Sequence, residues 1–262
     1  MDATTTSWAR RLVALVAVFP LVAACGGSGG SRHGSDGNDG NDGSWAAGAQ
    51  PAVARGADLV ISTDNGVRLR PADGDRAGVD RHIRHHWSHR DDTWVLDLSC
   101  PTRGPHGQEC PRMPEVDVPA GASVTVSARN AGIDVAGVLA ALDLTTVNGD
   151  VTVTRSGRGD AAVRLETRNG SVHAETLRAG KVHAETVNGD VTLDCATAPD
   201  RVGAVSTNGS VRVTVPRDAP AYRVTATTDN GRPSVTVPTV DVDDDRSMTL
   251  TTVNGDVTAG VE

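Results

Sequence analysis

Four histidines lie within eight residues of the chain, at His82, His85, His86 and His89. On a helix, this spacing would place all four imidazoles on one face, where they could bind zinc or copper. The segments on either side instead have the pattern of strand, turn and strand, and successive side chains of a strand point to opposite faces. We therefore expect a polar β-hairpin, in which Trp87 and Trp94 cover one end of the domain, with no metal and no cofactor. A metal site at the four histidines is the alternative.

The rest of the chain holds few residues suited to catalysis. Enzymes built on repeated β-strands, such as polysaccharide lyases, combine clustered carboxylates with a basic residue and with aromatic side chains that stack on sugars. Here the repeat region contains a single lysine, Lys181, and a single aromatic residue, Tyr222. We predict that the protein is not an enzyme.

The N-terminus has the features of an export signal. Arg10 and Arg11 precede an apolar run of 13 residues, 12–24, which is shorter than the roughly 20 residues of a membrane-spanning helix. The run ends in Val-Ala-Ala-Cys-Gly-Gly. This sequence resembles a bacterial lipobox, and the resemblance implies that the thiol of Cys25 is lipidated after cleavage. Residues 1–24 are then a lipoprotein signal peptide, and acyl chains hold the protein on the extracytoplasmic face of the cell membrane.

The other three cysteines have different expected roles. Cys100 and Cys110 bracket the loop CPTRGPHGQEC, which is rich in Pro and Gly. In an exported protein such a pair is expected to form a disulfide. Cys195 continues an inward-facing series of the repeat described below, so we expect it to be a buried free thiol.

Composition restricts the partners. Residues 25–52 are rich in Gly, Ser and Asp and are expected to form a flexible tether. Without residues 1–24 the chain carries 23 basic and 32 acidic residues, a net charge of −9 with neutral histidines. This negative charge excludes nucleic acid as a partner, because phosphate binding needs a basic surface. The predicted membrane contact is therefore the acyl anchor alone.

One short phrase recurs throughout the second half of the chain. Its asparagines are spaced 18, 21, 19, 20, 22 and 24 residues apart, at Asn130, Asn148, Asn169, Asn188, Asn208, Asn230 and Asn254. All but the first are followed directly by glycine, at Gly149, Gly170, Gly189, Gly209, Gly231 and Gly255. Apolar residues stand four and six positions before each asparagine, and three and five positions after it. Each unit therefore reads as a strand, an Asn-Gly corner and a second strand.

Two all-β architectures fit this unit. Asn-Gly between alternating strands is a strong hairpin signal, which would give an antiparallel meander or sandwich. A β-solenoid would instead stack coils of about 20 residues at roughly 4.8 Å. The recurrence of the same residue at the same position of each unit favours the solenoid, because stacked coils place identical residues next to one another. We expect coils in chain order, so that the coil of Asn254 ends the stack and truncation after Asp245 leaves a shortened solenoid.

The repeated [ST]xNG[DS]V phrase, the segment VDVPAG at 116–121 and a preceding Cys-bearing segment resemble the bacterial "putative adhesin" family of β-strand-repeat proteins. The resemblance covers about residues 57–262. It implies a right-handed β-solenoid and a surface location, but no activity. We divide the chain into a signal peptide (1–24), the tether (25–52), an N-terminal β segment with the Cys loop and a small β-hairpin extension (53–118), and solenoid repeats (119–262).

These observations predict a lipid-anchored, extracytoplasmic β-solenoid that serves as a non-catalytic surface scaffold, adhesion or binding module. Its ligand would be an envelope protein or polysaccharide. The alternative function is a metal-binding envelope lipoprotein that uses the segment from His82 to His89.

Overall fold

The computed structural model describes residues 51–53, 56–79, 83–99, 112–241 and 246–262. This part of the chain contains strands and turns but no helix, and hydrogen bonds join all of its strands. The strands are β1 (Asp58–Ser62), β2 (Val67–Pro71), β3 (Gly78–Val79), β4 (His86–Arg90), β5 (Thr93–Asp97), β6 (Glu115–Val118), β7 (Ser123–Ser127), β8 (Ile133–Ala136), β9 (Ala141–Asn148), β10 (Val151–Thr154), β11 (Gly157–Asn169), β12 (Val172–Asn188), β13 (Val191–Cys195), β14 (Arg201–Asn208), β15 (Val211–Val215), β16 (Arg223–Asn230), β17 (Pro233–Val235), β18 (Ser247–Asn254) and β19 (Val257–Val261).

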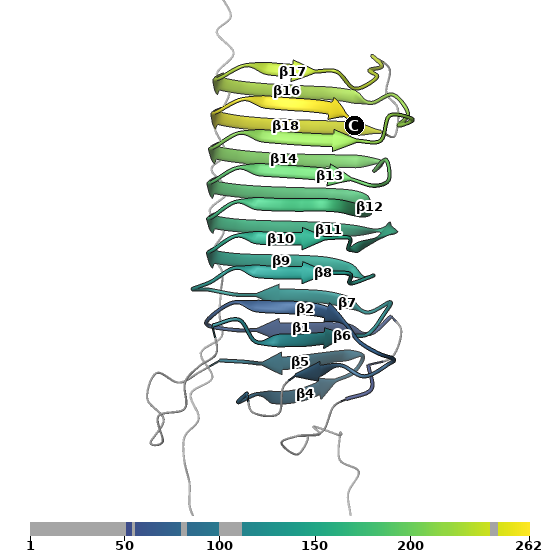
Figure 1. Cartoon of the computed structure of the whole chain (residues 1–262), viewed down its shortest axis with the longest axis vertical. Coiled ribbons are helices and arrows are strands. Elements are labelled where there is room, and N and C mark those ends of the chain that lie inside the picture. Colours follow the sequence, from purple (N-terminus) through teal and green to yellow (C-terminus); the bar gives the residue numbers. More distant parts are fainter. Residues whose placement is uncertain (1–50, 54–55, 80–82, 100–111, 242–245) are drawn as a thin grey trace, which may run out of the picture. The chain divides into compact units, whose positions relative to one another are not determined.

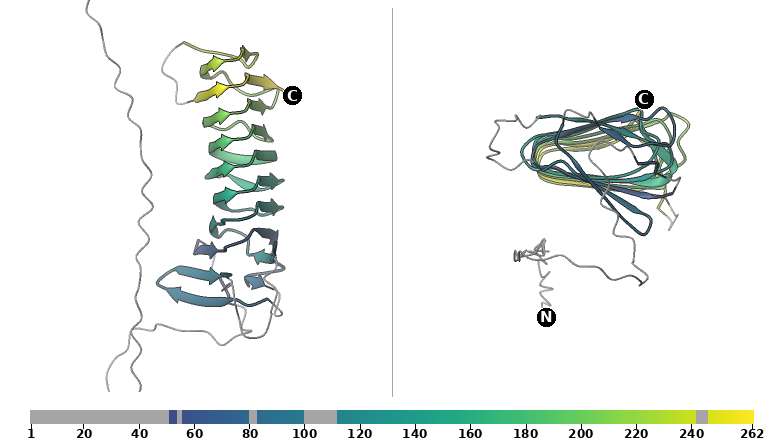
Figure 2. Two further views of the ribbon diagram at one scale, coloured as in Figure 1. Left: turned by 90° about the vertical axis from the view of Figure 1, so that its left-hand side faces the viewer. Right: turned by 90° about the horizontal axis from the view of Figure 1, so that it is seen from below.

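The strands form a β-solenoid, as the repeat predicts. Each coil crosses from one sheet to the other at its Asn-Gly corner, and equivalent strands of neighbouring coils pair in parallel (Figure 1). We call the sheet before the corners sheet I and the sheet after them sheet II. Viewed along the stack, successive coils superpose (Figure 2). The antiparallel meander is therefore wrong for the repeats.

Parallel register explains why the sequence copies itself. Asn169 pairs with both Asn148 and Asn188, and Val172 pairs with both Val151 and Val191. Like residues therefore lie in columns through the stack. The inward columns are fully buried over the middle coils, for example at Leu144, Leu165, Ala184 and Ala204. Together they form one continuous apolar core.

The chain does not stack its last coil at the end. Strand β18 lies between β14 and β16, and β19 lies between β15 and β17. The coil of Asn254 is thus internal, and the coil of Asn230 forms the end (Figure 1). Our expectation of chain order is wrong here, and truncation after Asp245 would remove an internal coil.

Composition gives a physical reason for this exchange, because β18 carries Met248 and Leu250 where β16 carries the smaller Val224 and Ala226. Met248 and Leu250 on β18 are fully buried, whereas no residue of β16 or β17 is fully buried. Val235 was expected to point inward but is 40% exposed. Its strand starts at Pro233, which has no backbone N–H and is tolerated at a sheet edge. The more apolar coil therefore takes the position with two neighbours.

The N-terminal end of the stack repeats this arrangement. Strands β4 and β5 form the predicted antiparallel hairpin. Strand β1 inserts between β5 and β7, and β2 inserts between β6 and β8. Strands β5 and β4 lie outside β1, and β6 and β3 lie outside β2, so the first coil in the sequence is internal, as the last one is. The sheets run without a break through the division made at residue 119.

Sequence reasoning missed an additional corner within the N-terminal segment. Asn65 and Gly66 follow Leu59 and Ile61, which stand six and four residues before Asn65 and are fully buried. Val67 pairs with Ile133 of the next coil. The phrase STDNGV is one residue shorter after the corner than its copies, so an alignment at fixed offsets passes over it.

Candidate binding surface

The described histidines of the predicted metal segment do not converge. His86 is exposed, and His89 packs against the ring of Trp94 with 4.1 Å between ring centroids. His85 contacts the carbonyl oxygen of Ile83 through Nδ1 at 2.7 Å. No metal-binding group of three residues includes any of these histidines in the part of the chain that the structure describes. His82 lies outside that part.

The tryptophans of this segment instead complete the core. Trp87 and Trp94 are buried, and their rings meet edge to face with centroids 6.4 Å apart. Such a pair adds stability beyond the area that it buries. As predicted, they cover the hairpin end of the stack.

The Asn-Gly corners are structural. Side-chain amides bond to one another along six of the seven asparagines, with nitrogen–oxygen distances of 2.9–3.0 Å, in the order Asn148, Asn169, Asn188, Asn208, Asn254 and Asn230. The hydroxyl two residues before a corner asparagine donates to the carbonyl oxygen of the corner glycine in the neighbouring coil, as from Thr186 to Gly170 at 2.7 Å. These groups are therefore occupied by one another and are poorly suited to holding a ligand.

A pocket of about 640 Å³ opens at the opposite edge of the coils, where the turns vary in length. Its lining combines glycines, small apolar residues and two arginines: Gly56, Ala120, Gly121, Leu139, Gly157, Arg158, Gly159 and Arg178. Leu139 is 47% exposed, the most of any large apolar side chain in the described residues. The pocket thus joins an apolar surface to two guanidinium groups.

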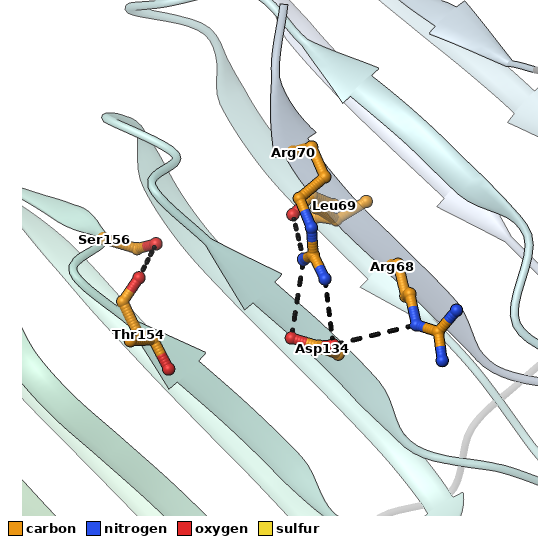
Figure 3. A network of polar contacts seen from close by, with 6 residues as sticks. All are labelled: Arg68, Leu69, Arg70, Asp134, Thr154 and Ser156. Atoms are coloured by element: carbon orange, nitrogen blue, oxygen red, sulfur yellow. Dashed lines mark hydrogen bonds and ion pairs between the residues drawn. The ribbon is translucent and has the colours of Figure 1, made fainter.

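The turn that carries Arg158 is fixed by local contacts. Ser156 is buried and donates to the carbonyl oxygen of Thr154 at 2.8 Å (Figure 3). It also accepts from the backbone N–H of Val138 at 3.1 Å. Gly157 has a φ of +89°, and a Cβ there would lie 2.2 Å from the carbonyl oxygen of Arg178. The backbone at the pocket is therefore held by bonds and by a close approach that requires glycine.

Charge at the pocket is only partly neutralised. Arg158 pairs with Asp160 at 2.6 Å, and this hydrogen bond lowers the pKa of the Asp160 carboxyl. By contrast, Arg68 and Arg70 on β2 both converge on Asp134 of β8, at 3.8 and 3.1 Å (Figure 3). Asp134 thus faces two guanidinium groups, while the Arg158–Asp160 pair joins one guanidinium to one carboxylate. A guanidinium group matches carboxylate and phosphate oxygens in two-point contacts.

Sequence reasoning missed this pocket, because its residues come from turns that vary between coils. The glycines in AGA (120–122), SGRG (156–159) and RAGK (178–181) were the available signal, since each of these segments lies at the variable edge. Only the stacked structure brings these turns together.

The predicted cysteine sites are tested only in part. Cys195 is free and fully buried, as expected, and burial raises the pKa of its thiol to about 12. Cys25, Cys100 and Cys110 lie outside the described residues, so lipidation and the disulfide stay predictions.

Comparison with known proteins gives the family. The model of the Toastrack DUF4097 family matches residues 117–260, more than half of the chain. This chain belongs to the Toastrack family. The residues that match the family model run from β6 to β19. No curated protein matches the sequence.

Two solved structures resemble the Toastrack chain. A "putative cell adhesion protein" of Clostridium sporogenes is 9% identical, with a TM-score of 0.34. The match covers 82% of this chain and 97% of the Clostridium chain. A "putative adhesin" of Bacteroides fragilis is 15% identical, with a TM-score of 0.42, and covers 82% and 95%. Within the described residues, no helix has the length and hydrophobicity of a membrane span.

Proposed function

We propose that this Toastrack protein is a lipid-anchored, non-catalytic binding module on the extracytoplasmic face of the cell membrane. The lipobox-like segment ending at Cys25 supports the anchor, and the Gly- and Asp-rich residues 25–52 support a tether between lipid and domain. The solenoid supplies a rigid body whose edges can carry variable turns.

The observation that carries the binding role is the pocket around Arg158 and Arg178. Its guanidinium groups favour an anion, while Leu139 and the glycines allow close approach of an apolar or flat surface. The chain as a whole is acidic, so this positive pocket differs from the rest of the protein and would select an anionic ligand. The ligand that fits is an envelope polysaccharide or protein that presents a carboxylate or phosphate.

Co-sedimentation with purified cell-envelope material tests this role. We expect Arg158→Ala combined with Arg178→Ala to reduce binding at least tenfold, because both guanidinium groups of the pocket are lost. Arg212→Ala is the matched control, since Arg212 is an exposed arginine on sheet II. Equal binding by the double variant and the control would refute the pocket as the ligand site.

The anchor has a separate test. Cys25→Ser removes the thiol that would be acylated, so we expect the variant to leave the detergent phase in a detergent-partition assay. Wild-type partitioning of Cys25→Ser would contradict lipidation at this residue.

A further inference from the structure

The pentapeptide VHAET occurs twice on strand β12, at residues 172–176 and 182–186. The second copy lies on sheet I, where its histidine meets two carboxylates. His183 Nε2 lies 3.5 Å from Oε2 of Glu185 and 3.8 Å from Oε1 of Glu166. All three ligand atoms lie within 4.8 Å of one another.

The parallel register of two strands holds these side chains together. Glu185 on β12 pairs with Glu166 on β11, and both flank fully buried alanine or leucine residues of the core. His183 stands two residues before Glu185, so it lies on the same outer face. The site is therefore built on the middle of the stack, where backbone movement is most restricted.

Charge at this site favours a cation. The Glu166 side chain is 19% exposed, and burial raises the pKa of its carboxyl; nearby Glu185 and Asp143 raise it further, while Arg164 and His183 lower it. Three carboxylates thus face one guanidinium group. Arg164 pairs with Oε1 of Glu166, the same oxygen that faces His183. A carboxylate oxygen has two lone pairs, so it can accept from the guanidinium with one and bind a cation with the other.

The next coil leaves room for the imidazole. Sheet I places Gly203 beside His183, and a Cβ at residue 203 would lie 3.1 Å from His183 Nδ1. Any larger residue would crowd the ring. The glycine therefore lets the ring lie against the neighbouring coil while Nε2 faces the carboxylates.

We propose that Glu166, His183 and Glu185 bind a divalent transition cation, and that Zn²⁺ is the best match. One imidazole nitrogen and two carboxylate oxygens suit zinc, which keeps a further position open when the protein supplies three ligands. Ligands at about 2.1 Å in a tetrahedron lie about 3.4 Å apart, close to the 3.5 and 3.8 Å observed from His183. The two glutamate oxygens, which lie within 4.8 Å of each other, would move closer together to complete the set.

The first VHAET copy supplies a matched control on the same strand. His173 Nε2 lies 3.0 Å from Oε1 of Glu175, on the outer face of sheet II. Among the described residues, no third histidine, cysteine or carboxylate completes a metal-binding group there. Two protein ligands hold zinc far less firmly than three, so this pair should not bind it alone.

Isothermal titration of Zn²⁺ into the full chain, purified in detergent and stripped with a chelator, tests the proposal. We expect the wild type and His173→Ala to bind one more equivalent than His183→Ala, or to bind at least about tenfold more tightly. Added Zn²⁺ should also raise the melting temperature of the wild type more than that of His183→Ala.

The comparison between variants separates this site from the histidine-rich segment at residues 82–89, which is intact in all three proteins. Glu185→Gln changes an exposed side chain and should also lose zinc binding. It therefore tests the site independently of any effect of His183→Ala on the fold. Equal zinc binding by the wild type, His183→Ala and Glu185→Gln would overturn the proposal. So would an equal loss in His173→Ala and His183→Ala.

Discussion

At the residue scale, the corner glycines show how closely the coils approach. A Cβ at Gly189 would lie 2.1 Å from the carbonyl oxygen of Gly170, and one at Gly255 would lie 2.4 Å from that of Gly209. Both glycines also have positive φ, at +152° and +147°. Both have a coil on each side, whereas Gly231 belongs to the end coil.

We therefore predict similar destabilisation by Gly189→Ala and Gly255→Ala, each of about 1–3 kcal/mol, the cost of a strained backbone. Gly231→Ala should cost less, because the end coil can move outward to relieve the contact with Gly255. Denaturant unfolding of the three variants measures this. A smaller loss for Gly255→Ala than for Gly231→Ala would restore stacking in chain order.

Tyr222 gives a second test at this scale. It is the only tyrosine in the chain, is fully buried and donates to the carbonyl oxygen of Pro199 at 2.9 Å. Burial raises the pKa of its hydroxyl from 10.0 to about 12. Because the unfolded chain releases this proton first, the stability it contributes is present below pH 10 and is lost as pH rises from about 10 to 12.

Ultraviolet absorbance of the tyrosinate should report this titration in the native protein without interference from other tyrosines. Tyr222→Phe provides the control, since it removes the signal and should flatten the loss of stability over the same pH range. Titration of the folded wild type near pH 10 would show that Tyr222 is accessible to solvent.

Sequence offsets predict many of these residue positions, because each corner fixes the parity of its flanking strands. Val163 and Val182, which stand six positions before Asn169 and Asn188, are buried, as the offsets require. Val224 is only partly buried although it has the same offset, because an end coil has a neighbour on one side only. The glutamates and histidine of the proposed zinc site could not be grouped from sequence, since their contact depends on which coils adjoin.

At the element scale, the intercalated coil of β18 and β19 gives a paired test. Met248 and Val224 occupy the same column and are direct partners in the sheet. Met248 is fully buried and Val224 partly so. We predict that Met248→Ala costs about 2–5 kcal/mol and that Val224→Ala costs clearly less. Thermal or chemical unfolding compares them. The opposite ranking would place the coil of Asn254 at the end of the stack.

The order of the coils could not be predicted from the repeat. Every coil presents the same inward pattern, so any coil can pair with any other in register. The weak signal was the composition of the end coil, which carries Asp229, Arg232 and Pro233 around its corner. Charges and proline are typical of protected sheet edges, and here they mark the coil that has no outer neighbour.

At the scale of the whole molecule, the cysteines provide a test of export. We predict a disulfide between Cys100 and Cys110 in protein taken from the envelope, and a thiol at Cys195 that does not react with alkylating reagents until the domain unfolds. The raised pKa and full burial of Cys195 both suppress the thiolate that would react. Peptide mapping without reduction checks the pairing, and a bond that includes Cys195 would contradict it.

The insertion of β1 between β5 and β7 has a mechanical consequence. The chain enters the solenoid through β1, so a pull from its N-terminal side loads the hydrogen-bond ladders to β5 and β7 together. A strand at the outer edge would have only one ladder and could be peeled off. In a protein held by the proposed N-terminal anchor, drag would therefore act on a strand that is paired on both sides.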